Sequence, residues 1–263
     1  MAARGEYTRQ EMMAVAASRL VNDGELVLTG FGLPIVAAIL AKYTHAPNLV
    51  LMTEAGVYDP RPAHLPFCIA DSRFAYMSSW FGTPVELLGH ILQSRRVDVG
   101  FLGGAQVDKY GNLNSTCVGD YLRPAKRFEG SGGAADFAAM SRRTIIMMAH
   151  EKRRIVEQVD FITSPGWRCS RFPGGEKVFR EEMGMWGGPA AVVTTMGVMK
   201  FDPETREMYV ESFYADLDVT PEEIRANTGF DIDVSRAEPC TPPTYEELEL
   251  LRTRIDPERV FIK

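Results

Sequence analysis

Hydrophobic residues along the chain alternate between helical spacing and short unbroken runs. Thr8 and Glu11 have the Thr-x-x-Glu form of a capping box, and the apolar residues after them recur every three or four positions, which predicts a helix. The apolar runs 25–29 and 48–53 predict buried strands, and the stretch 33–43 between them predicts a helix. This β-α-β order implies parallel strands joined by a right-handed crossover.

The same alternation continues through the rest of the chain. It predicts a hairpin tip at 110–112 and a second hairpin with strands at 191–201 and 208–213. The other predicted elements are strands at 73–78, 97–102 and 144–149, and helices at 85–93, at 134–142, from 220 onward and at 245–254. The chain shows no internal repeat and no clear linker. We therefore predict one α/β domain over residues 1–263, with a mostly parallel, mixed sheet flanked by helices.

Composition and charge narrow the class of protein. Of the 263 residues, 45% are hydrophobic and 24% are charged, which is ordinary for a globular chain and excludes disorder. The net charge of −6 argues against a nucleic-acid-binding protein. No run approaches the roughly 18 apolar residues of a membrane-spanning helix, and residues 1–12 lack the apolar core of a secretory signal. We expect neither a nucleic acid nor a membrane as partner.

Cysteine and histidine usage predicts a reducing compartment and no metal site. The four cysteines are widely spaced and form no Cys-x-x-Cys pair, so we expect reduced thiols in a cytoplasmic protein. The four histidines form no His-Glu-x-x-His cluster, and we expect no bound metal.

Candidate chemistry lies where the predicted strands end, because ligands of open α/β sheets bind beyond the carboxyl ends of the strands. Gly30-Phe31-Gly32 follows the first strand and precedes a helix, whose free N–H groups could receive an anion. Ile35 occupies the position of the third glycine of a dinucleotide fingerprint, and no Lys-Ser/Thr pair follows, so neither that motif nor a phosphate loop is predicted. A tight structural turn is the alternative interpretation.

Glu54 directly follows the second predicted strand and precedes Ala55-Gly56. A carboxylate that is buried at such a place must be paired, hydrogen-bonded or protonated. Above a cleft it could act as a nucleophile or a base, and its small neighbours would leave room for a substrate. A solvated loop acid is the alternative.

Gly103-Gly104-Ala105-Gln106 follows a third predicted strand. Adjacent glycines let main-chain N–H groups face a ligand, and the side-chain amide adds a donor, so the segment is a candidate oxyanion site. A β-bulge followed by a hairpin is the alternative. Gly130–Gly133 is either a similar anion-binding nest or the start of a helix. The basic cluster 151–154 could bind phosphates or a partner chain, and the alternative is a solvated face. No Ser, His and Asp can be assigned to a catalytic triad.

Taken together, these segments make the chain resemble the family I coenzyme A-transferases, and among them the β subunits of the glutaconate type. Their order and spacing cover nearly the whole chain and are far more specific than any single motif. One departure is Ala55, where β subunits of this type carry Ser. The matching segments are TGFGLP (29–34), the Glu-x-Gly at 54–56, GGAQVDKYGNLNST (103–116), GDYLRPAKRFEGSGGA (119–134), IIMMAHEKRR (145–154), FITSPGW (161–167) and NTGFDIDVS (227–235).

The resemblance implies that Glu54 is the catalytic nucleophile. Its carboxylate would attack the donor acyl-CoA thioester to form a mixed anhydride, and the released CoA would then give a glutamyl–CoA thioester that the acceptor acid resolves. The segment 103–106 would supply oxyanion donors and CoA contacts. The CoA thioester is a substrate here, and no tightly bound cofactor is expected. The residues expected to bind it are Gly30, Gly32, Gly103, Gly104 and Gln106.

The resemblance also implies a partner. Glutaconate-type enzymes divide the active site between α and β chains of similar fold, so we expect a hetero-oligomer, α2β2 or larger, that is inactive without its α subunit. A CoA-thioester hydrolase, a decarboxylase or a ring-cleaving enzyme of the same fold is the alternative, although those lines lack the nucleophilic glutamate in the corresponding chain. A non-catalytic subunit that only binds CoA or the other chain is a third hypothesis.

Overall fold

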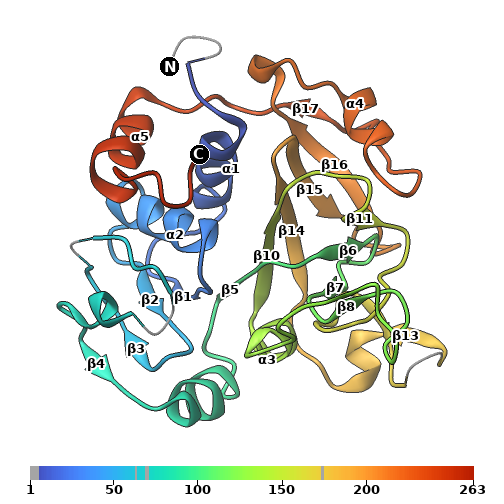
Figure 1. The fold of residues 1–263 in the computed structure, drawn as a ribbon, viewed down its shortest axis with the longest axis horizontal. Coiled ribbons are helices and arrows are strands. Elements are labelled where there is room, and N and C mark those ends of the chain that lie inside the picture. The colour runs from blue at the N-terminus through green and yellow to red at the C-terminus, as the bar shows by residue number, and fades with distance from the viewer. Residues whose placement is uncertain (1–5, 63, 69–70, 173–174) are drawn as a thin grey trace.

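The computed structural model describes residues 6–62, 64–68, 71–172 and 175–263, which form strands and helices in the order drawn in Figure 1. In chain order, the elements are α1 (Arg9–Ser18), β1 (Leu26–Leu28), α2 (Leu33–Tyr43), β2 (Val50–Met52), β3 (Val57–Tyr58), β4 (Trp80–Phe81), β5 (Val99–Leu102), β6 (Gln106–Asp108), β7 (Leu113–Asn114), β8 (Cys117–Val118), β9 (Lys126–Arg127), α3 (Ala134–Met140), β10 (Arg143–Met148), β11 (Ile155–Val156), β12 (Arg168–Ser170), β13 (Lys177–Phe179), β14 (Pro189–Thr194), β15 (Gly197–Phe201), β16 (Met208–Phe213), α4 (Pro221–Ala226), β17 (Glu238–Pro239) and α5 (Tyr245–Leu250). Short 3₁₀ turns span Ser72–Ala75, Arg180–Met183 and Ala215–Leu217, and wider π-helical turns span Val85–Leu92 and Leu251–Ile255.

A ten-stranded mixed sheet organises the molecule, with the strand order β17-β16-β15-β14-β10-β5-β1-β2-β3-β4. The five central strands, from β14 to β2, all run parallel to one another. Antiparallel strands extend the sheet beyond them on both sides, β15 and β16 at one side and β3 and β4 at the other. The prediction of an α/β fold with a mostly parallel, mixed sheet is confirmed.

The chain leaves the two neighbouring strands β1 and β5 in opposite directions along the sheet. From β1 it passes through α2 to β2 on one side, whereas from β5 it passes through α3 to β10 on the other. The sheet therefore has a topological switch point between β1 and β5. In parallel sheets, the crevice beyond the carboxyl ends of the strands at such a point is the preferred place for a ligand.

The first two helices form where the sequence predicts them, for local reasons. Thr8 Oγ1 accepts a hydrogen bond from the Glu11 N–H (3.1 Å), and Glu11 Oε2 accepts one from the Thr8 N–H (2.8 Å), which completes the capping box of α1. Helix α2 begins with Pro34 in its first turn, and residues 34–41 are all buried. It packs against α1 and α5 at one side of the molecule (Figure 1).

The predicted hairpin tip at 110–112 is confirmed, and a buried carboxylate holds it together. Strands β6 and β7 pair antiparallel on either side of the tip. Asp108 is fully buried and accepts hydrogen bonds from the Tyr110 N–H (3.0 Å), the Asn112 N–H (3.0 Å) and the Asn112 side-chain amide (2.9 Å). These bonds satisfy the polar groups of a turn that would otherwise be costly to bury.

Two predictions of strands are wrong. Residues 73–78 do not form a strand, because Asp71 Oδ1 accepts a hydrogen bond from the Arg73 N–H (2.9 Å) and caps a 3₁₀ turn instead. The segment 191–201 is not one strand but parts of β14 and β15. Thr194 Oγ1 accepts hydrogen bonds from the Met196 N–H (3.2 Å) and the Gly197 N–H (3.3 Å), and this closes a turn between the two strands. The hairpin of β15 and β16 is confirmed.

Within the described residues, every helix is too short or too polar to cross a lipid bilayer.

Candidate active site

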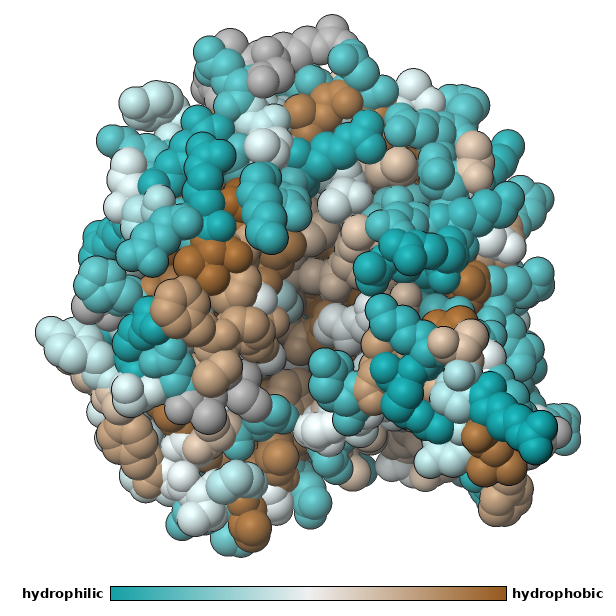
Figure 2. Space-filling model, in the orientation of Figure 1, coloured by the Kyte–Doolittle hydropathy of each residue, from teal (hydrophilic) through white to brown (hydrophobic). Residues whose placement is uncertain are grey.

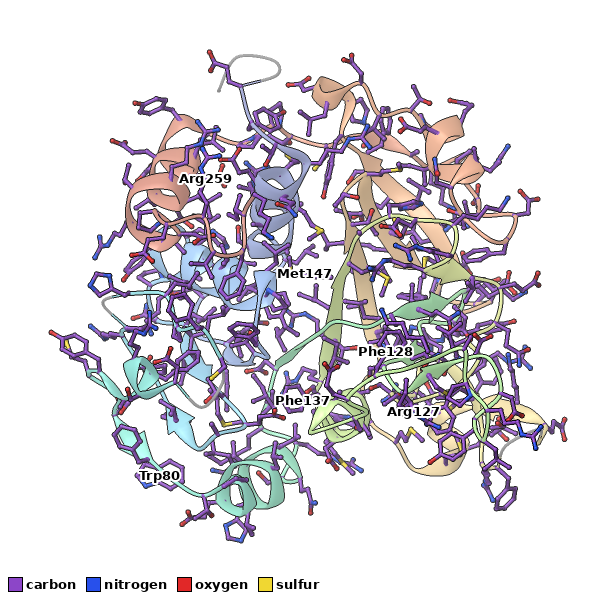
Figure 3. The ribbon with its side chains drawn as sticks, viewed as in Figure 1. Trp80, Arg127, Phe128, Phe137, Met147 and Arg259 are labelled. Atoms are coloured by element: carbon purple, nitrogen blue, oxygen red, sulfur yellow. The ribbon has the colours of Figure 1, made fainter. Side chains whose placement is uncertain are left out.

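Three loops that follow parallel strands meet at the switch point and enclose a pocket of about 440 Å³. Gly30 comes from the loop after β1, Glu54 from the loop after β2 and Gly103 from the loop after β5, as the strand-end argument predicted. Figure 3 labels one of its walls, Phe137, near the middle of the face, and Figure 2 shows apolar side chains in the furrow there. We call this cavity the Glu54 pocket. Its lining residues are Gly30, Phe31, Pro34, Glu54, Cys68, Phe101, Leu102, Gly103, Glu129, Ser131, Ala134 and Phe137.

A tight turn between β2 and β3 presents Glu54 to this pocket. The Thr53 N–H donates to the Val57 carbonyl (3.0 Å), and the Gly56 N–H donates to the Thr53 carbonyl (3.2 Å). Gly56 has φ of +101°, and a Cβ at this position would lie 2.0 Å from the Gly82 carbonyl oxygen. Only glycine fits both conditions, which explains the glycine of the Glu-x-Gly motif.

The Glu54 carboxylate faces the glycine-rich turn before α3. Oε2 accepts a hydrogen bond from the Gly133 N–H at 3.0 Å. Gly133 has an ordinary φ of −79°, so its backbone does not require glycine. A Cβ there, however, would lie 2.5 Å from Glu54 Oε2 and 2.9 Å from the Phe137 ring. The absence of a side chain at Gly133 therefore makes room for the carboxylate.

Side chains from neighbouring segments hold this turn in place. The Ser131 hydroxyl accepts a hydrogen bond from the Ala135 N–H (3.0 Å), which begins helix α3. The Ser115 hydroxyl donates to the Gly130 carbonyl (2.9 Å), and the Gly130 N–H donates to the Ser115 carbonyl (3.0 Å). The turn is thus tied both to its own helix and to the segment after β7, so the Gly133 N–H has a defined direction.

The predicted binding glycines divide into two groups. Gly30 and Gly103 line the pocket with Glu54. Gly32 is outside the lining; with φ of +95°, it makes the turn into α2 that a residue with a side chain would strain. Gly104 also lies outside the lining, and a Cβ on it would meet the Leu113 side chain at 3.1 Å, so it packs on the β6–β7 hairpin.

Gln106 is not a pocket residue, and its side chain is buried in hydrogen bonds within the protein. Its Oε1 accepts from the Asn114 side-chain amide (2.8 Å) and from the Asp160 N–H (3.2 Å). Its Nε2 donates to Asp160 Oδ2 (3.2 Å). The side-chain amide is therefore committed to packing β6 against β7 and the loop after β11.

The hydrogen bonding and the apolar surroundings of Glu54 leave one of its carboxylate oxygens available for chemistry. The side chain is half-buried, and within the described ranges its Oε1 receives no hydrogen bond from the protein. Phe31, Phe101 and Phe137 form the apolar walls around it. A carboxylate with an unengaged oxygen in such a cavity can attack an electrophilic carbonyl carbon, and the apolar walls limit the access of competing water.

Four residues at the site were not assigned a role from the sequence. Gly133 and Ser131 lie in a segment for which the sequence predicts only a nest or a helix start, although glycines directly before a helix are the same signal that marks Gly30 and Gly32. Cys68 and Glu129 reach the pocket from loops and carry no local signal of function.

Comparison with known proteins places this geometry in context. The family model described as coenzyme A transferase matches residues 10–221. The B chain of the glutaconate CoA-transferase of Acidaminococcus fermentans is 41% identical over 100% of this chain and 98% of its own length. The B chain of the 3-oxoadipate CoA-transferase of Pseudomonas knackmussii is 37% identical over 94% of this chain and 92% of its own. The crystal structure of glutaconate coenzyme A-transferase from Acidaminococcus fermentans superposes with a TM-score of 0.88 and 40% identity, covering 98% of each chain.

Proposed function

The chain belongs to the coenzyme A transferase family, and we propose that it is the β-type subunit of a heteromeric CoA-transferase in which Glu54 is the nucleophile. The enzyme moves CoA from an acyl-CoA to a carboxylic acid. The position of the Glu54 carboxylate supports this role most directly, because it lies in a pocket at the switch point of the sheet and accepts a hydrogen bond from the Gly133 N–H at 3.0 Å.

In the first half-reaction, a Glu54 oxygen attacks the thioester carbonyl of the donor, and the C–S bond breaks. This gives a mixed anhydride and CoA thiolate. The thiolate then attacks the γ-carbonyl of Glu54, so the donor acid leaves and a glutamyl–CoA thioester remains on the chain. The acceptor carboxylate repeats the two steps in reverse. A carboxylate suits this exchange because the anhydride keeps the acyl group activated, whereas a serine ester would lose much of that activation.

Gly133 has two roles in this scheme. In the resting enzyme, its N–H orients the Glu54 carboxylate. During attack on the γ-carbonyl, the same donor faces an oxygen on which negative charge develops, which is the function of an oxyanion-hole donor.

Gly30 and Gly103 are the proposed contacts for the acyl-CoA, because they line the pocket beside the nucleophile. Their lack of side chains allows the thioester to approach the main chain closely. Gly32, Gly104 and Gln106 contribute by shaping the loops that carry these contacts, as their packing and hydrogen bonds support. The CoA thioester enters as a substrate, and we propose no tightly bound cofactor.

The partner in this proposal is an α-type subunit, in a hetero-oligomer of α2β2 or larger size. Both relatives described above are named as the second chain of a CoA-transferase, and they match nearly the whole of this chain. The cytoplasm remains the proposed location, which is compatible with the four free cysteines.

Trapping of the covalent intermediate tests the proposal. The complex is reconstituted with its α-type subunit, incubated with acyl-CoA and reduced with borohydride, which converts a glutamyl thioester to the alcohol. Peptide mass mapping is expected to find this reduction at Glu54. An unmodified Glu54 peptide in a complex that transfers CoA would contradict the proposal. Free acid as the sole product, without dependence on an acceptor, would instead indicate the hydrolase or lyase alternative.

Shortening the nucleophile gives a second test. Glu54→Asp withdraws the carboxylate by one methylene, about 1.5 Å, so direct attack on the thioester fails while a water molecule can still be activated. We expect CoA transfer to fall and thioester hydrolysis to appear, measured as free acid formed with and without an acceptor carboxylate. An equal loss of both activities would contradict the positional role of the carboxylate.

A further inference from the structure

We propose that Glu129 is a specificity-determining residue of the Glu54 pocket, which selects against acyl groups whose tails carry a negative charge. The part of the site that this chain builds therefore favours carboxylic acids with an uncharged, chiefly apolar tail. This inference rests on the proposed function, since it takes an acyl-CoA thioester as the ligand of the pocket.

The lining of the Glu54 pocket combines apolar walls with negative charge. Its only polar side chains are the carboxylates of Glu54 and Glu129, the Cys68 thiol and the Ser131 hydroxyl, among the residues that the structure describes. The Ser131 hydroxyl accepts a hydrogen bond from the Ala135 N–H at 3.0 Å and brings no charge to the pocket. No lysine, arginine or histidine from the described ranges occurs in this lining. Both of the charges that these residues bring to the pocket are therefore negative.

The basic residues that precede Glu129 contact neighbouring rings, and within the described part of the chain neither forms an ion pair with Glu129. Lys126 Nζ lies 5.1 Å from the centre of the Phe128 ring, and the Arg127 guanidinium lies 4.7 Å from the centre of the Tyr121 ring and donates to the Tyr121 carbonyl. Glu129 is exposed and forms no ion pair or hydrogen bond through its side chain with the described part of the chain. Its charge remains free to act on a ligand.

The proposed reaction requires no proton transfer to or from Glu129. A carboxylate attacks, a thiolate leaves, and the later steps exchange the same groups, so neither a general acid nor a general base is required. The effect of Glu129 is therefore electrostatic. An acyl tail that ends in a carboxylate would enter a cavity that already holds two like charges, whereas an apolar tail contacts Phe31 and Phe101 without that repulsion.

The substrate class that we infer differs from the acids in the names of the two relatives. Glutaconate and 3-oxoadipate are both dicarboxylates. A comparison of acids with equal chain length and different tail charge therefore separates the inference from simple likeness to those proteins.

The test uses the first half-reaction of the reconstituted complex, with pentanoyl-CoA and glutaryl-CoA, which differ only in the tail methyl or carboxylate. The second-order rate of borohydride-trappable labelling at Glu54 is measured for each. We expect pentanoyl-CoA to react faster in the wild type. In Glu129→Gln, the pentanoyl-to-glutaryl ratio should fall by roughly three- to tenfold, as expected for removal of one partly solvated like charge.

Two variants serve as controls. Glu129→Asp keeps the charge and should keep the preference for pentanoyl-CoA. Glu204→Gln removes an equal charge from the exposed turn between β15 and β16 and should leave the ratio unchanged. A wild type that prefers glutaryl-CoA, or a ratio that Glu129→Gln does not lower, would overturn the inference while Glu54 is still labelled. Failure of both thioesters to label Glu54 would instead overturn the proposed function.

Discussion

Two carboxylates of this protein, Glu54 and Asp108, stand at the end of a strand in loops with a nearby glycine, yet their surroundings differ. Asp108 is fully buried, and its oxygens accept hydrogen bonds from the Tyr110 N–H and from both nitrogens of Asn112. Glu54 is half-buried in a pocket and, among the residues that the structure describes, accepts one, from the Gly133 N–H. A carboxylate whose oxygens are saturated by its own turn holds the fold together, whereas one that keeps an unengaged oxygen in a cavity can react with a ligand.

The same contrast separates the two glycine-rich segments that the sequence presented as anion sites. In 103–106, the Gln106 side-chain amide forms hydrogen bonds with Asn114 and Asp160. In 130–133, the Gly133 N–H is directed at the carboxylate of the pocket. The composition of such a segment thus indicates donors, but only their partners show whether they serve the fold or a ligand.

The largest expected effect comes from Glu54→Gln. The amide keeps the shape and the hydrogen bond from Gly133 but is not a nucleophile, so CoA transfer should fall on the order of 10⁴-fold. The free energy of unfolding should change by less than about 0.5 kcal/mol, because the side chain has little structural role. Steady-state transfer and urea unfolding measure the two effects. A variant that unfolds easily would mean that Glu54, like Asp108, belongs to the fold.

Gly133→Ala should produce the next largest effect. The backbone there tolerates alanine, but the new Cβ would lie 2.5 Å from Glu54 Oε2, so the carboxylate must move away from its donor. We expect transfer to fall on the order of 10²-fold, as for loss of an oxyanion donor. Tm should fall as well, because the buried Phe137 ring, 2.9 Å from the new Cβ, must shift. Gly89→Ala is the matched control, because its Cβ meets only the Val85 side chain at 3.6 Å. Equal effects of the two substitutions on transfer would contradict the role of Gly133.

Asp108→Asn tests whether the buried carboxylate of the comparison serves the fold rather than the reaction. In either orientation, the new amide nitrogen would face the Asn112 side-chain nitrogen that now donates to both carboxylate oxygens, so a donor would oppose a donor in a buried turn. The free energy of unfolding should fall by about 2 kcal/mol, measured by urea denaturation. The rate of transfer per folded molecule should remain close to that of the wild type. A selective loss of transfer would place this hairpin in the active site.

His150 extends the comparison to a buried group that titrates. Its Nδ1 lies 3.1 Å from Thr194 Oγ1 and its Nε2 lies 3.2 Å from Thr228 Oγ1, and burial lowers its pKa from 6.5 to about 4. The unfolded chain therefore binds a proton below pH 6.5 that the folded chain does not. The stabilising contribution is complete above pH 6.5 and is lost as the pH falls toward 4, by about 1 kcal/mol per pH unit.

The control for this smallest effect is His150→Gln, which keeps polar atoms near both threonines and does not titrate. Urea unfolding at pH 7.5, 6 and 5 should show a flatter dependence for the variant than for the wild type. Parallel curves would show that another group is responsible for the acid sensitivity.

Much of the fold could be predicted from the sequence because it depends on neighbours within a few positions. The capping box at Thr8, the glycine turn into α2 and the strand before Glu54 all appear as predicted. The two wrong strand predictions also depend on contacts between residues that are close in the sequence. Asp71, just before one predicted strand, and Thr194, inside the other, each form a turn through a single polar side chain where the apolar residues indicated a strand. Here a local hydrogen bond outweighed the hydrophobic pattern.

The sequence by itself determined the order of strands and helices and the placement of Glu54 at a strand end, because propensity, capping and periodicity act over short stretches of chain. Only the tertiary structure decided which loops meet. Gly133 reaches Glu54 across 79 residues, and Gln106 turns away from the pocket toward Asp160. Both outcomes follow from a strand order that does not match the order of the chain, and from buried polar groups that must find partners wherever the packing places them.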